Sequence, residues 1–88
     1  MKIYKYELKP DLSTELHIEK YARLLSCQVQ RGVICLWYLV DEYEKTEKRT
    51  FYRVGTGKRF DASNSVYIGT VQQEPYVWHI WEGKQDED

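Results

Sequence analysis

The sequence predicts an all-β fold: a small antiparallel sandwich or partly closed barrel of six or seven strands. Three observations support this prediction. Aromatic residues, which favour strands, make up 15% of the chain. Several segments alternate apolar and polar side chains with a period of two. Clusters of turn-forming residues separate these segments at short spacing, which is typical of small sandwiches and barrels.

The length of the chain, 88 residues, allows one compact domain. Hydrophobic residues make up 42% of it and charged residues 31%, a balance typical of a globular protein. We expect a single β domain over residues 1–82, followed by a flexible acidic tail over residues 83–88.

The N-terminal part of the chain predicts two strands. In residues 2–8, Tyr4 and Tyr6 share one face because alternate side chains of a strand point the same way. A turn cluster follows, and the alternation resumes over residues 14–18. Residues 19–23 lack a helix stop signal, so we expect a loop or turn there.

The clearest hairpin of the chain joins residues 24–30 to the apolar run 33–40 through Arg31 and Gly32. Both faces of the run are apolar, which predicts a central strand covered on both sides. Residues 41–48 are almost all polar or charged, so we expect an exposed connection.

A two-residue turn at Arg31 and Gly32 also fixes the expected register of this hairpin. Cys27 then faces Leu36, and Cys35 faces Gln28. The two thiols lie diagonally on opposite faces in this register, so we expect reduced cysteines and no disulfide.

The C-terminal half predicts three further strands. Residues 49–54 regain strand character and end at Gly55 and Gly57, where glycine permits the positive φ of a tight turn. Residues 66–71 and 76–81 alternate again and form the last two predicted strands.

The charge balance and hydropathy restrict the possible partners. Thirteen Lys and Arg against fourteen Asp and Glu give a net charge of -1, which lacks the positive excess typical of nucleic-acid binding. The longest apolar run is too short to cross a bilayer as a helix, and no apolar signal segment is recognisable. We therefore expect a cytoplasmic protein without a membrane partner.

No catalytic, metal-binding or cofactor motif is recognisable in the sequence. The run Gly55-Thr-Gly57-Lys58 lacks the first glycine, the Ser or Thr and the helix of a phosphate-binding loop, so a sharp turn is favoured. The cysteines and histidines lack the close spacing of metal ligands. His17 and His79 have no nucleophile motif beside them, and packing in a strand is favoured for His79. We expect no enzyme activity, no metal and no cofactor.

Aromatic and basic side chains of the C-terminal half suggest a binding surface. Aromatic side chains anchor protein interfaces and stack on nucleic-acid bases. Our candidates for this surface are Tyr52, Arg53, Lys58, Arg59, Tyr76, Trp78 and His79. A wider basic patch would add Lys2, Lys5 and Arg49.

Several segments resemble a family of small bacteriophage and prophage proteins. They are 15–18, 24–30, 35–41, 48–51, 54–57, 67–71 and 77–79. The resemblance covers nearly the whole chain and implies a shared fold, without catalytic residues to transfer. Glu19 stands where relatives have proline, and Lys58 where histidine is common.

A phage origin implies a cytoplasmic location in a bacterial host cell and a host protein or complex as partner. The leading hypothesis is therefore a non-enzymatic phage or mobile-element protein that binds a host macromolecule, with inhibition of bacterial immunity as one role. The alternatives are a small β-barrel that binds single-stranded nucleic acid and a virion accessory protein. An enzyme using His17 or His79 is least favoured, and a homodimer stays open.

Overall fold

The computed structural model describes residues 1–84, which form seven strands and no helix. These residues therefore contain no helix that could cross a membrane. The strands are β1 (Lys2–Glu7), β2 (Ser13–Glu19), β3 (Arg23–Gln30), β4 (Val33–Val40), β5 (Thr46–Gly55), β6 (Ser65–Gln73) and β7 (Tyr76–Gly83). They confirm the all-β prediction.

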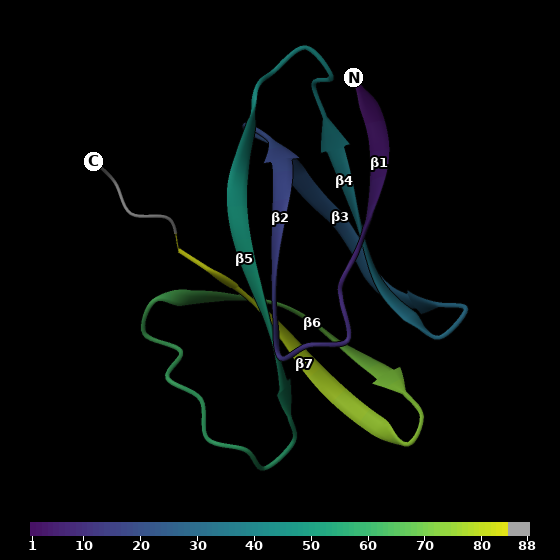
Figure 1. Cartoon of the computed structure of the whole chain (residues 1–88), viewed down its shortest axis with the longest axis vertical. Coiled ribbons are helices and arrows are strands. Elements are labelled where there is room, and N and C mark those ends of the chain that lie inside the picture. Colours follow the sequence, from purple (N-terminus) through teal and green to yellow (C-terminus); the bar gives the residue numbers. More distant parts are fainter. Residues whose placement is uncertain (85–88) are drawn as a thin grey trace.

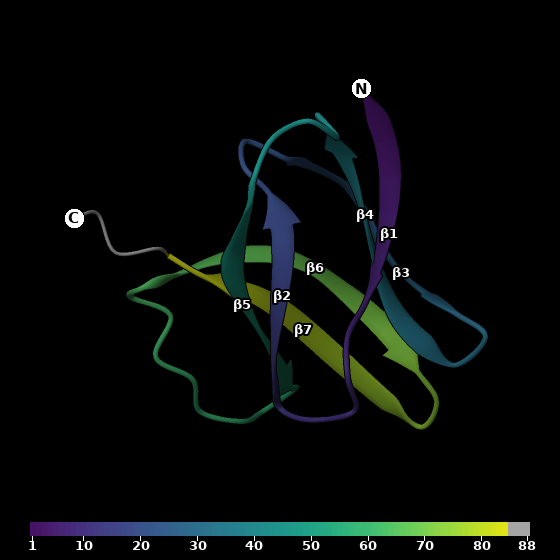
Figure 2. The same cartoon turned by 45° about the horizontal axis from the view of Figure 1, so that its top comes forward.

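Two antiparallel sheets build the fold. One has the strand order β1-β4-β3 and the other β2-β5-β7-β6. Figure 1 shows β6 and β7 crossing obliquely below β2 and β5, and Figure 2 shows the same twist from a second direction. The sheets form a sandwich that does not close, so the barrel alternative is wrong.

The hairpin of β3 and β4 has the predicted register, with Cys27 opposite Leu36 and Gln28 opposite Cys35. Arg31 and Gly32 both have positive φ, as a two-residue turn between twisted strands requires. Both cysteines are free, as predicted.

The core lies between the two sheets and is centred on β4. Four alternate residues of β4 are 0% exposed: Ile34, Leu36, Tyr38 and Val40. The second sheet contributes Ile18, Phe51, Val71 and Ile80 to the same cluster. On the outer face of β4, only Cys35 is buried and the others are half-buried. The prediction that this strand is covered on both sides is therefore right for the face toward the second sheet and wrong for the outer face, over which the described residues place no further layer.

The predicted exposed connection over residues 41–48 is wrong in its second half. β5 begins at Thr46, which pairs with Glu19, and Lys48 pairs with His17. These polar residues form a strand because backbone pairing with β2 satisfies their amides while their side chains stay in water. The turn predicted over residues 19–23 is confirmed for residues 20–22, whereas Glu19 ends β2 and Arg23 begins β3.

The last two strands are longer than predicted. β6 contains a register shift between Tyr67 and Gly69, and a Cβ at Gly69 would lie 3.4 Å from Cβ of Cys27 on the opposite sheet. Glycine therefore permits a close approach here. β7 includes Gly83, and the Lys84 amide donates to the Asn64 carbonyl at 2.7 Å. Residues 85–88 of the predicted acidic tail lie outside the described residues.

Both thiols are expected to react slowly with iodoacetamide at pH 8. Burial raises the pKa of Cys27 from 9.0 to about 11, and burial also raises the pKa of Cys35. Since the thiolate is the nucleophile, Cys27 should react about 100-fold more slowly in the native than in the urea-unfolded chain. The native rate should rise as the pH approaches 11.

Mass spectrometry of the alkylated peptides measures both rates over a pH series. Equal rates in the native and unfolded chains at pH 8 would contradict the packed position of these thiols.

Candidate functional site

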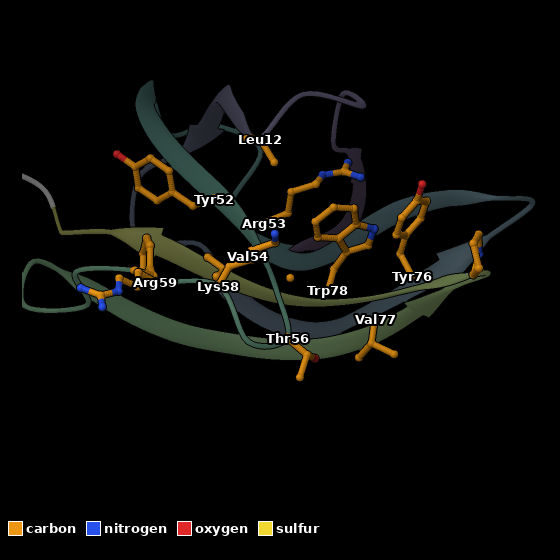
Figure 3. A pocket seen from close by; sticks show the side chains of 13 residues that line it. Leu12, Tyr52, Arg53, Val54, Thr56, Lys58, Arg59, Tyr76, Val77 and Trp78 are labelled. Atoms are coloured by element: carbon orange, nitrogen blue, oxygen red, sulfur yellow. The ribbon is translucent and has the colours of Figure 1, made fainter.

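A groove of about 800 Å³ lies at the end of β5. Pairing with β2 ends at Ser13 and Tyr52, and β5 continues to Gly55 beside β7. The connection after β1, the loop after β5 and the start of β7 contribute the remaining walls (Figure 3). The groove exists because β2 is shorter than β5 at this end.

The structure brings six of the seven candidate binding residues together around this groove. They are Tyr52, Arg53, Lys58, Arg59, Tyr76 and Trp78. They come together because β5 and β7 are neighbours, with Gly55 opposite Trp78 and Tyr52 opposite Trp81. Whether this surface binds a partner stays a prediction.

Two groups of aromatic rings lie around the groove. The rings of Tyr76 and Trp78 are 5.5 Å apart at an interplanar angle of 32°. On the opposite face of the sheet from Trp78, Phe60 lies 6.0 Å from Tyr52 and 5.3 Å from Trp81. These contacts of Phe60 hold the loop after β5 against the sheet, because aromatic pairs at such distances attract each other.

The charges of the groove have a single sign. Arg53, Lys58 and Arg59 line it, whereas none of the lining residues found in the described part of the chain is Asp or Glu. The net charge of the whole chain is -1. The lining of the groove is therefore positive, although Asp11, Asp61 and Glu74 directly adjoin the lining residues Leu12, Phe60 and Pro75 in the chain.

The turn after β5 places the two exposed cations. The Lys58 amide donates to the Gly55 carbonyl at 3.1 Å, and Gly57 has a φ of +85°, which favours glycine. No helix follows within the described residues. The interpretation of Gly55-Thr-Gly57-Lys58 as a sharp turn is therefore confirmed.

His79 is the candidate residue that does not line the groove. Its neighbours along β7 alternate, so it lies on the opposite face of the sheet from Trp78. The distances from Nε2 to Thr56 Oγ1 and from Nδ1 to Thr70 Oγ1 are 2.8 Å and 3.0 Å. Because Thr56 does line the groove, His79 supports its wall from behind.

The wider basic patch predicted from the sequence does not form. Lys2 and Lys5 lie on β1, in the other sheet. Arg49 points into the interior, where Nε and Nη2 donate to Glu82 at 2.6 Å and 2.9 Å. Its guanidinium lies 4.9 Å from the centroid of the Tyr38 ring. The prediction failed because Arg49 lies on the inner face of β5.

Sequence reasoning missed several residues at this end of the molecule. Phe60 lies in a turn-rich loop without periodicity, so nothing in the sequence indicated that its ring packs on the sheet. Gln73 accepts from Trp78 Nε1 at 3.0 Å and donates to the Gly32 carbonyl at 2.8 Å. Only the strand register, which places Gln73 opposite Tyr76, could have suggested this role.

Residues 1–84 contain no group of three or more His, Cys, Asp or Glu side chains placed to hold a metal ion. Fold and groove together define an antiparallel β-sandwich with an aromatic, basic groove at one end. The chain belongs to the family described as a domain of unknown function (DUF7352), whose model matches residues 1–88. No curated protein and no solved structure matches the chain.

Proposed function

We propose that this chain is a non-enzymatic binding module whose groove holds an acidic, partly apolar segment of a partner protein. The observation that carries this proposal is the positive charge of the residues that line the groove. Three cations and, among the residues that the structure describes, no carboxylate line the groove of a chain whose net charge is -1. Such a surface is complementary to negative charge and would repel a basic partner.

The aromatic rings support a protein partner in particular. Trp, Tyr and Arg are the residue types that most often dominate the energy of protein interfaces, and the groove contains all three types. Apolar side chains of the segment would contact Tyr76 and Trp78, while its carboxylates would face Lys58 and Arg59. Both cations are exposed and held at the turn after β5.

The resemblance to phage and prophage proteins suggests where the partner comes from. If the chain acts in an infected cell, the partner is a host protein, and a component of host defence is one such protein. The resemblance supports this origin, and the groove supports the acidic character of the segment.

Fluorescence anisotropy with a labelled octapeptide of alternating Glu and Leu tests the proposal. We expect this probe to bind and the double variant Lys58→Glu, Arg59→Glu to weaken binding at least tenfold, because two attractive charges become repulsive. The matched control is Lys20→Glu, Lys45→Glu, which changes the same charge on exposed residues outside the groove.

A probe of alternating Lys and Leu should not bind. Equal binding of the acidic probe to both double variants would contradict the groove as its site. Binding of an eight-residue thymidine oligonucleotide without binding of the acidic probe would favour single-stranded nucleic acid instead, since bases also stack on aromatic rings.

A further inference from the structure

Arg53 is buried and forms no salt bridge with any of the described residues. It is 6% exposed, and its guanidinium donates to the Lys9 carbonyl at 2.5 Å and to Gln73 Oε1 at 3.2 Å. Both acceptors are neutral, and Nε is buried without a hydrogen-bond partner in the described part of the chain. Burial lowers the pKa of Arg53, and the negative charge of Asp11 acts in the opposite direction. The two side chains form no ion pair in the described part of the chain.

Arg49 is a partly buried arginine of the same strand whose charge is paired with a carboxylate. It precedes Arg53 by four residues on the same inner face of β5, and each guanidinium lies over an aromatic ring, at 4.9 Å from Tyr38 and 5.3 Å from Trp78. Arg49 forms a two-point ion pair with Glu82. The two sites differ in that a carboxylate compensates only one of them.

A buried charge without a partner is unfavourable, and proteins normally provide a counterion or a hydrogen-bonded network for it. A guanidinium has five N–H donors, and the described residues accept from Arg53 at two points. Arg53 also lines the open groove, with Trp78 and Tyr76 beside it (Figure 3). A carboxylate held in the groove would therefore lie beside this guanidinium, although Nε itself is closed to solvent.

We propose that Arg53 receives a carboxylate of the bound segment and determines the specificity of the groove. This inference rests on the proposed function, because it assumes an acidic segment in the groove. Arginine binds carboxylates through charge-assisted, often two-point hydrogen bonds. Lys58 and Arg59 are exposed to solvent, which screens them. Arg53 is shielded from water, so its pairing discriminates more strongly between ligands.

The carboxylate has two possible sources: an Asp or Glu side chain and the C-terminus of the partner chain. Two probes separate them. The first is an octapeptide of alternating Glu and Leu with a blocked, amidated C-terminus. The second is N-acetylated tetraleucine with a free C-terminal carboxylate.

Two-dimensional NMR of the arginine Nε–Hε groups provides the readout. We expect at least one probe to shift the Arg53 signal and neither to shift that of Arg49, whose Nε already donates to Glu82. A response to the first probe assigns a side-chain carboxylate, and a response to the second assigns a C-terminus. Shifts of the Gly55 and Lys58 backbone amides without a shift of Arg53 Nε would overturn this inference and leave the proposed function intact. An absence of shifts at all these positions would overturn both.

A variant pair provides an independent test. Arg53→Met removes a charge that lacks a counterion, so we expect the urea midpoint of unfolding to stay unchanged or to rise while the affinity for the responding probe falls at least tenfold. Arg53→Lys keeps the charge but loses the two-point geometry, and it should bind with intermediate affinity. A folded Arg53→Met variant that binds the probe as tightly as the parent chain would overturn the inference.

Discussion

Replacing Arg49 by methionine is expected to lower the free energy of unfolding by about 3–5 kcal/mol. Arg49 and Glu82 are only 15% and 16% exposed at their side chains and form an ion pair at 2.6 Å. The substitution leaves the Glu82 carboxylate in the interior with Tyr38, whose hydroxyl is 3.4 Å away and weakly placed to compensate. Urea unfolding followed by tryptophan fluorescence measures the loss.

The control for this substitution is Arg23→Met, at an exposed position of β3. It should change the free energy of unfolding by no more than about 0.5 kcal/mol. The double variant Arg49→Met, Glu82→Leu should recover most of the loss, because it removes both charges together. If Arg49→Met lowers the free energy of unfolding no more than Arg23→Met does, the ion pair between Arg49 and Glu82 does not stabilise the fold.

Replacing Ile80 by alanine should lower the free energy of unfolding by about 2–5 kcal/mol, since it removes a fully buried side chain and leaves a cavity. Ile80 is 0% exposed and pairs with Arg53 on one side and Gly69 on the other. It therefore lies at the centre of the sheet that carries the groove. Thermal and urea unfolding both measure the effect.

Val77→Ala on the same strand is the matched control. Val77 is 38% exposed and separated from Ile80 by an odd number of positions, so it points to the other face of the sheet. Its loss should stay below about 1 kcal/mol. A larger loss for Val77→Ala than for Ile80→Ala would mean that the two faces of β7 are assigned the wrong way round.

The sequence predicted which kinds of side chain line the groove, but it did not predict that they meet or that a hollow forms between them. Tyr52, Arg53, Tyr76 and Trp78 are suggested by the aromatic and basic character of two strands that the alternation identifies. Their meeting depends on the pairing of β5 with β7, which joins strands separated by β6 in the chain. The hollow itself depends on β2 beginning only at Ser13, so that its pairing with β5 stops at Tyr52 while β5 continues to Gly55.

The different roles of Arg49 and Arg53 are not visible in the sequence. Both are arginines in one polar segment, four residues apart, and alternation places them on the same face. What separates them is that Glu82 lies across the sheet near Arg49, whereas Gln73 lies near Arg53. The wrong prediction of a wide basic patch followed from this lack of information about neighbours.

The sequence by itself determined most of the local structure of this protein: the strands apart from the start of β5, the β3–β4 hairpin with its register, and the turn at Gly55 and Gly57. These features depend on side-chain alternation and on backbone preferences of a few adjacent residues. The tertiary structure alone decided which strands are neighbours, which face of each sheet is buried and which arginine finds a carboxylate. The physical reason is that burial and charge pairing depend on residues far apart in the chain, such as Arg49 and Glu82, which only the packing of the folded chain brings together.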